Sequence, residues 1–337
     1  GGVRNDQVRV ATNDGIVCWP CIVSANESPK QAGLYYAGTD DGVVSGSKDG
    51  GKTWDKTLAD RIPGFVKGGF VSEVVPSKFD LGTVYVTQDA HRLNDFETHI
   101  WVSNDFGATF RSLNANLKGE IARSITEDPR NGDVLYLATE AGMQISIDRG
   151  KSWKKFKGQN FPDIRVDEIV VHPRDNALLI ATHGRGMWIL DHLEAVQEYA
   201  AAAAGTADVK LFTPDQALQW RQWDDRNDEF WGHQFWVGEN PPTQAVLQLY
   251  YKKPASDASL RFTDAAGKTL REMPLGNRGA GIQTVCWDMR VDAIGAGGAP
   301  DPNANRGGGA GAAGAGGGAI NPQAAAAAQA GRGAGGG

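Results

Sequence analysis

Two repeated sequence patterns constrain the fold of this chain more than any other feature does. The first occurs four times and consists of a turn with proline, an apolar strand, a polar or glycine turn and a second strand. The prolines of the four copies are roughly 44 to 53 residues apart and are Pro29, Pro76, Pro129 and Pro173. Short strands at this period predict an all-β fold, with four antiparallel β-propeller blades over residues 14–193 rather than a solenoid.

The second pattern, Ser-x-Asp-x-Gly-x-Thr/Ser-aromatic, follows the first three copies in phase. Its Asp carboxylate can accept backbone N–H groups of its own turn, its Gly supplies a positive φ, and its hydroxyls add local bonds. We expect the aromatic side chain to point back between sheets and bury a large apolar area. The positions are Ser47, Asp49, Gly51 and Trp54; Ser103, Asp105, Gly107 and Phe110; and Ser146, Asp148, Gly150 and Trp153.

These motifs resemble the Asp box of sialidases, sortilin-type propellers and related BNR-repeat proteins. In those families the Asp box lies on the outer hairpin and is structural. The resemblance therefore implies that Asp49, Asp105 and Asp148 are not catalytic carboxylates.

The fourth copy has no Asp box and continues as the run ATHGRGMWILD over residues 181–191. This run resembles the closing blade of bacterial BNR-repeat proteins that are labelled glycosyl hydrolase or sortilin N-terminal domain. Four blades are too few for the usual ring of this family. The resemblance therefore implies further blades upstream, and residues 1–13 are interpreted as a remnant of that upstream region.

The composition changes after residue 193. Residues 194–241 are interpreted as a linker, helical at its alanine-rich start and aromatic over Trp220–Trp236. The aromatic stretch either packs against a neighbouring domain, the interpretation that we favour, or stacks on sugar rings. Residues 242–292 contain a strand, a hairpin and a segment, 281–290, that ends in Trp-Asp-Met-Arg. This order resembles an immunoglobulin-like module of the flagellar hook-cap type.

That module needs further strands, so an incomplete β-sandwich is predicted there. Residues 293–337 are a Gly/Ala-rich low-complexity tail that we expect to be disordered.

Charge and hydropathy exclude some classes of partner. The net charge of −6 gives no reason to expect nucleic acid or an anionic membrane. The chain contains no apolar run of about 20 residues, the length needed to span a bilayer. No signal peptide is visible, although the family resemblance implies an extracellular or periplasmic location.

Cys18 and Cys21 have redox or metal-ligand spacing. The residues on both sides of this pair have the pattern of a β-strand, so we favour a non-catalytic pair that is either reduced or joined in a disulfide. We expect neither a metal nor a cofactor.

A candidate site lies on the turns between the second and third strands, at the end of the blades opposite the Asp boxes. Sialidase-like enzymes use that face for substrate. Each residue also has an ordinary structural interpretation, because turns favour Asp and Gly and charged groups pair between blades. The candidate ligand-binding residues are Asp41, His91, Arg92, Glu140, His183 and Arg185.

Two functions remain open at this point. The favoured one is a secreted propeller scaffold that binds a peptide, glycan or protein partner, while the rest of the same polypeptide completes the propeller and the sandwich. The alternative is a glycoside hydrolase, sialidase-like or glucanase-like, whose active site is completed by blades missing from this chain. Sialidase chemistry needs three arginines and a Tyr/Glu pair, whereas this face offers Arg92, Arg185 and no obvious tyrosine. Two carboxylates about 5–10 Å apart across the central channel of the propeller would favour the glycoside hydrolase over the binding scaffold.

Overall fold

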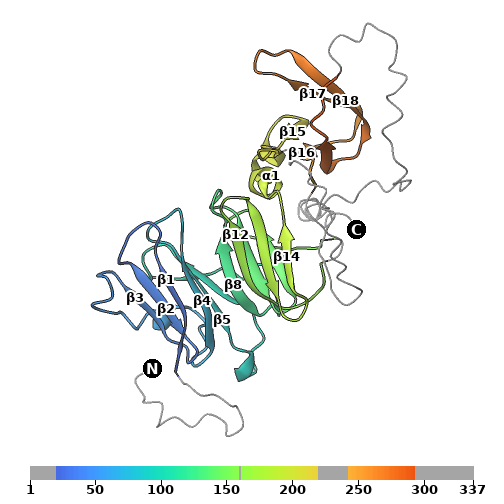
Figure 1. Cartoon of the computed structure of the whole chain (residues 1–337). Coiled ribbons are helices and arrows are strands. Elements are labelled where there is room, and N and C mark those ends of the chain that lie inside the picture. The colour runs from blue at the N-terminus through green and yellow to red at the C-terminus, as the bar shows by residue number, and fades with distance from the viewer. Residues whose placement is uncertain (1–19, 159–160, 219–241, 293–337) are drawn as a thin grey trace, which may run out of the picture.

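The fold is known from a computed structural model, which describes residues 20–158, 161–218 and 242–292 (Figure 1). Its first part consists of four antiparallel sheets in chain order. The first sheet contains β1 (Ile22–Glu27), β2 (Tyr35–Thr39) and β3 (Val44–Ser47), and the second contains β4 (Phe70–Pro76), β5 (Val84–Asp89), β6 (His99–Ser103) and β7 (Arg111–Ser112). The third contains β8 (Ala122–Glu127), β9 (Leu135–Thr139), β10 (Gly142–Ser146) and β11 (Lys154–Lys155), and the fourth contains β12 (Val166–His172), β13 (Ala177–Thr182) and β14 (Met187–Leu190).

The four sheets stand in a row, from the blue first sheet to the green fourth sheet (Figure 1). Their first strands, β1, β4, β8 and β12, follow one another as neighbours and form the inner edge of the row. Two short 3-10 helices, η2 (Ala59–Arg61) and η3 (His91–Leu93), lie in the loops of the first two sheets. The predicted fold of four consecutive antiparallel blades, each of three or four strands, is confirmed.

Three apolar clusters lie between successive sheets. The cluster between the first and second sheets includes Tyr36, Val74 and Trp101, all almost fully buried. The cluster between the third and fourth sheets is centred on Met143 and Ile169. Full burial of one large apolar side chain stabilises the fold by about 1.5–3 kcal/mol. Each sheet therefore depends on its neighbours for most of its burial.

The Asp-box hairpins close through local hydrogen bonds. Thr109 donates its backbone N–H to Asp105 Oδ1 (2.8 Å) and its hydroxyl to Asp105 Oδ2 (2.6 Å). The Ser103 hydroxyl donates to Asp105 Oδ1 (2.7 Å) and accepts from the Gly107 N–H (2.8 Å). Gly107 has a φ of +83°, which favours glycine. The same bonds recur at Asp49 and Asp148.

The expected burial of the Asp-box aromatic side chain is wrong for Trp54. Trp153 is 1% exposed and packs against the second sheet, whereas Trp54 is 39% exposed. Phe110 and Trp153 pack toward the sheet that precedes their own, whereas no sheet precedes β1–β3 within the described ranges. Trp54 instead donates its indole N–H to Gly51 O (3.0 Å) and stacks on Tyr35 with ring centroids 6.5 Å apart.

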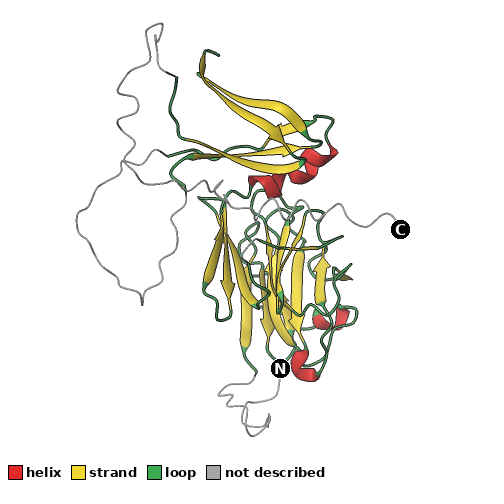
Figure 2. Ribbon diagram, turned by 90° about the vertical axis from the view of Figure 1, so that its right-hand side faces the viewer, coloured by secondary structure: helices red, strands yellow, loops and turns green. Residues whose placement is uncertain are grey.

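Helix α1 (Glu194–Ala204) lies between the row of sheets and two further sheets (Figure 2). One of these contains β15 (Val209–Leu211), β16 (Ala245–Tyr251) and β19 (Gly281–Trp287), and the other contains β17 (Ala255–Thr263) and β18 (Thr269–Arg278). The helix and the hairpin lie where the sequence predicts them. The immunoglobulin-like assignment and the domain limits stay predictions. Cys18, the 1–13 segment, the Trp220–Trp236 stretch and the 293–337 tail lie outside the described residues.

Candidate functional site

The turns that follow the second strands lie at the end of the sheets opposite the Asp boxes, because successive turns of an antiparallel meander alternate between its two ends. A repeated backbone bond holds these turns beside the residue that precedes the first strand of their own sheet. The bonds are Asp40 N to Cys21 O (3.1 Å), Glu140 N to Ile121 O (3.1 Å) and His183 N to Arg165 O (2.9 Å). The first residue of each turn is therefore placed next to the inner edge of the row.

A chain of charged side chains crosses this end of the molecule. It begins at His91, whose Nδ1 lies 2.6 Å from Asp89 Oδ1. The other oxygen of Asp89 accepts a bond from Arg123 Nη1 at 2.8 Å. The link joins the end of β5 to β8, so it connects the second sheet to the third.

The chain continues from the third sheet to the fourth. Arg123 Nη2 pairs with Glu140 Oε1, and Arg165 Nε lies 3.8 Å from the same oxygen. Arg165 also donates to Asp167 at 2.6 Å, and His183 Nδ1 lies 3.7 Å from the second Asp167 oxygen. We call this set the rim network; its members are His91, Asp89, Arg123, Glu140, Arg165, Asp167 and His183.

The rim network has a buried centre and exposed ends. Asp89 is 3% exposed, and the Arg123 side chain is only slightly more accessible. Arg123 Nε is buried and has no hydrogen-bond acceptor among the described residues. His183 at one end is exposed to solvent. A buried charge of this kind needs its partner, because removal of one member leaves the other uncompensated.

Three of the six residues predicted from the sequence belong to the rim network: His91, Glu140 and His183. Asp41 instead accepts a bond from the Thr39 hydroxyl in its own turn. Arg92 and Arg185 are exposed, each close in sequence to a histidine of the network, and their side chains form no ion pair within the part of the chain that the structure describes. The predicted face therefore presents two unpaired guanidinium groups beside a fixed ionic network.

Sequence reasoning missed four members of the network: Asp89, Arg123, Arg165 and Asp167. A signal existed in the repeats. The strand registers place four residues at the same repeat position, at the end of the second strand or directly after it: Asp40, Asp89, Glu140 and His183. Asp40, rather than Asp41, is therefore the first-sheet counterpart, and it accepts a bond from Cys21 N at 2.7 Å.

A second pair of carboxylates lies on the inner strands. Glu73 on β4 accepts a bond from Ile125 N on β8 at 2.7 Å. Burial and the nearby Glu168 carboxylate on β12 raise the pKa of Glu73 to about 8. Burial, followed by the charge of Asp167, also raises the pKa of Glu168. These two carboxylates occupy the same repeat position in the second and fourth sheets.

One cluster among the described residues could offer three metal ligands. The ligand atoms of His192, Glu194 and Asp215 lie within 4.8 Å of one another. Arg130 already donates to Glu194 at 3.0 Å, and His192 lies 3.3 Å from Asp215. Arg130 and His192 therefore already give these two carboxylates partners within the protein.

Comparison with protein families gives one match. Residues 98–261 match the Sortilin-Vps10 family, described as sortilin, neurotensin receptor 3. The predicted resemblance to BNR/Asp-box propellers is thereby confirmed for this segment. No curated protein matches the chain. No helix within the described ranges is long and apolar enough to cross a membrane.

Several solved propeller structures are similar in fold. An ancestral GH74 enzyme aligns at 16% identity and a TM-score of 0.40, over 50% of this chain and 22% of that one. The GH74 xyloglucanase from Xanthomonas campestris aligns at 16% identity and a TM-score of 0.42, over 78% and 36% of the two chains. YCF48 bound to D1 peptide aligns at 12% identity and a TM-score of 0.37, over 51% and 50%. This chain spans half or less of each, and similarities at this level carry no argument about ligand or activity.

Proposed function

We propose that this chain, an Asp-box propeller chain that matches the Sortilin-Vps10 family over residues 98–261, is a binding scaffold that acts outside the cytoplasm. Its ligand surface is the rim network together with Arg92 and Arg185. The ligand is an acidic or polyhydroxylated group on a peptide, glycan or protein. The rest of the same polypeptide completes the propeller.

The observation that carries this proposal is the position of the two unpaired arginines beside the rim network. A guanidinium group presents a planar fork of donors that fits a carboxylate or a pair of hydroxyls. Arg92 and Arg185 form no ion pair in the described part of the chain, so both keep their donors for a ligand. A turn does not require either residue for its own geometry.

The rim network supports the proposal by fixing its surroundings. The pairs His91–Asp89 and Arg123–Asp89 bridge two sheets at 2.6 and 2.8 Å. Side chains held in this way lose little conformational freedom when a ligand binds, which favours affinity. The face is therefore preorganised around the two exposed arginine side chains.

The test is a ligand screen followed by a paired substitution. The chain is screened on glycan and acidic-peptide arrays, and the best ligand is titrated against Arg92→Ala/Arg185→Ala. We expect affinity to fall at least about tenfold and its salt dependence to weaken, because charge contacts in solvent are screened. Arg111→Ala/Arg174→Ala removes the same charge from exposed sites elsewhere and should bind normally. Unchanged affinity in the first variant, with the fold intact, would rule out this face.

A glycoside hydrolase is the second candidate, and the Glu73–Glu168 pair is the observation that favours it. A glycosidase needs one carboxylic acid that stays protonated near neutral pH and a second carboxylate close by. Glu73, with a pKa of about 8, has the protonation state of such an acid. Turnover of chromogenic glycosides that is lost in Glu73→Gln would support hydrolysis. Absence of turnover across a broad glycoside panel would favour the binding scaffold.

A further inference from the structure

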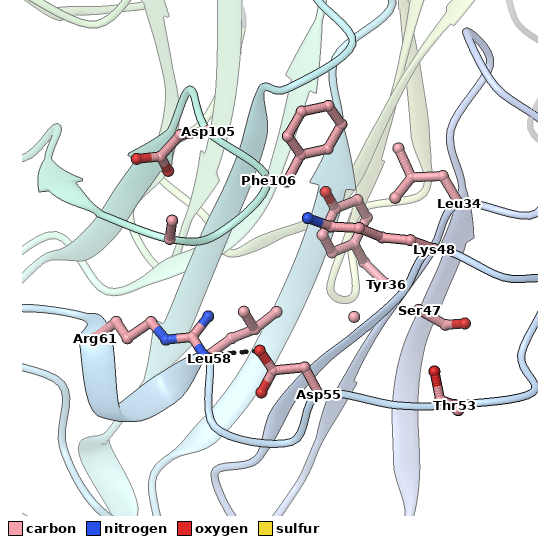
Figure 3. Close-up of a pocket in the computed structure, with 12 residues that line it drawn as sticks. Leu34, Tyr36, Ser47, Lys48, Thr53, Asp55, Leu58, Arg61, Asp105 and Phe106 are labelled. Carbon is pink, nitrogen blue, oxygen red and sulfur yellow. Dashed lines mark hydrogen bonds and ion pairs between the residues drawn. The ribbon is translucent and has the colours of Figure 1, made fainter.

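A pocket of about 290 Å³ lies between the first two sheets at the Asp-box end, away from the rim network (Figure 3). The first two Asp-box hairpins contribute to its walls. We call it the Tyr36 pocket; the residues that matter for its chemistry are Tyr36, Lys48, Asp55, Arg61, Asp105 and Phe106. Its charged groups differ in whether they have partners within the protein.

Tyr36 occupies a position that is tyrosine in three of the four sheets. In the second sheet the Tyr85 hydroxyl donates to Glu127 Oε1 at 3.1 Å, and in the third the Tyr136 hydroxyl donates to Asp128 Oδ2 at 3.0 Å. The Tyr36 side chain is 1% exposed, and its hydroxyl has no hydrogen-bond partner in the described structure. Burial raises the pKa of Tyr36 to about 12, so the group remains a neutral donor.

The missing acceptor has a cause in the sequence. Tyr85 bonds to Glu127, the last residue of the inner strand of the following sheet. The strand registers place Pro76 at the corresponding position of the sheet that follows Tyr36. Because proline has no side-chain acceptor, the Tyr36 hydroxyl is left unpaired beside the pocket.

Lys48 is the second donor without an acceptor. Its ammonium nitrogen lies 4.6 Å from the centroid of the Phe106 ring. In Figure 3 its side chain extends across the pocket toward Phe106, in front of the Tyr36 ring. Within the described residues this ammonium group forms no ion pair, and it is exposed at the mouth of the pocket.

The remaining charges of the pocket are already satisfied. Asp55 accepts from Arg61 at 2.7 Å, and Arg61 also donates to Gly107 O at 3.1 Å. Both oxygens of Asp105 accept bonds from Thr109 in its own turn. The unpaired donors at the pocket are therefore the buried Tyr36 hydroxyl and the Lys48 ammonium group at its mouth, whereas both carboxylates of the pocket already accept hydrogen bonds.

We propose that the Tyr36 pocket binds a small amphipathic carboxylate. The carboxylate accepts bonds from the Tyr36 hydroxyl and the Lys48 ammonium group, and the apolar part of the ligand packs on Phe106, Leu34 and Leu58. A charged acceptor satisfies both donors at once, and bonds to an ionised group are the stronger kind. The site is distinct from the rim network and does not depend on the function proposed for it.

The first test is a titration of the full chain with benzoate, followed by NMR, with benzamide as the uncharged control of the same shape. We expect saturable shifts with benzoate and at least about tenfold weaker binding of benzamide. Tyr36→Phe and Lys48→Gln should each weaken benzoate binding by about tenfold. Lys52→Gln changes an exposed lysine of the same hairpin that does not line the pocket and should leave binding unchanged.

Equal binding of benzoate and benzamide, or normal benzoate binding in both pocket variants, would overturn the proposal. Arg92→Ala/Arg185→Ala should bind benzoate normally, so failure at the rim and failure at this pocket can be told apart.

The second test is thermal stability without ligand. Tyr36→Phe removes a hydroxyl that has no partner, so its Tm should stay the same or rise. Tyr136→Phe removes a hydroxyl bonded to Asp128 and should lower Tm. A Tm loss in Tyr36→Phe equal to that in Tyr136→Phe would show that the Tyr36 hydroxyl already has a partner, and the proposal would then be wrong.

Discussion

At the scale of single residues, Glu73 shows how the position of a side chain fixes its protonation. The carboxyl group lies on an inner strand, is partly buried, accepts one backbone bond from Ile125 and has Glu168 as a charged neighbour. Burial and the negative charge of Glu168 raise the pKa of Glu73 by more than the Ile125 bond lowers it, so the pKa rises to about 8. The folded state therefore binds a proton that the unfolded chain, with an ordinary carboxyl pKa, releases near pH 4.5.

This predicts a stability that falls as the pH rises. A carboxyl group whose pKa is raised in the folded state stabilises the fold fully below the unfolded pKa. That contribution is lost as the pH rises from about 4.5 to about 8. Glu73→Gln keeps an acceptor for Ile125 but cannot ionise, so the free energy of unfolding should decline less over this range. Denaturant unfolding at pH 5 and pH 8 measures the difference; the same decline in both proteins would contradict the assignment.

At the scale of the element, the Asp-box hairpin is stabilised by a few local bonds. The Thr109 hydroxyl and N–H bonds lower the pKa of Asp105 to about 2, so the carboxylate stays ionised throughout the neutral range. Asp105→Ala should lower the free energy of unfolding by about 1 kcal/mol. Asp60→Ala, which changes an exposed aspartate with no bonded turn of this kind, is the control. Loss of binding at the rim network in a fully folded Asp105→Ala protein would contradict its structural role.

The sheet faces allow a matched comparison at the same scale. Ile145 on β10 and Ile189 on β14 occupy equivalent registers, opposite Tyr136 and Leu179. Ile145 is 4% exposed and packs against the fourth sheet, whereas Ile189 is 55% exposed. Ile145→Ala should therefore cost about 2–5 kcal/mol, and Ile189→Ala no more than about 0.5 kcal/mol, in denaturant unfolding. Equal losses would show that the outer face of the fourth sheet is covered in solution.

At the scale of the whole molecule, the repeats predict the sheets but not the contacts between them. The Pro and Asp-box periods are local signals, so strand pairing within each blade follows from the sequence. The burial of Trp54 does not follow, because it depends on which sheet precedes β1. Only three of the seven members of the rim network were predicted, because its contacts join different repeats: Arg123 and Asp89 are 34 positions apart. An alignment of the four copies is needed to see that Asp89 and Glu140 occupy the same repeat position. Their shared contact with Arg123 depends on how the sheets pack and does not follow from the alignment.

The buried pair at the centre of the rim network should couple the second and third sheets. Arg123 and Asp89 are 2.8 Å apart and both largely buried, so the loss of either one removes a close partner of the other in a poorly solvated site. Arg123→Gln and Asp89→Asn should each lower the free energy of unfolding by about 3–5 kcal/mol. The double variant removes both buried charges of this pair, while Glu140 still has Arg165 nearby, so it should lose clearly less than the two single losses added together. Chemical denaturation of the four proteins measures this coupling. Strictly additive losses would mean that the pair does not hold the two sheets together and that the rim network is a set of independent surface contacts.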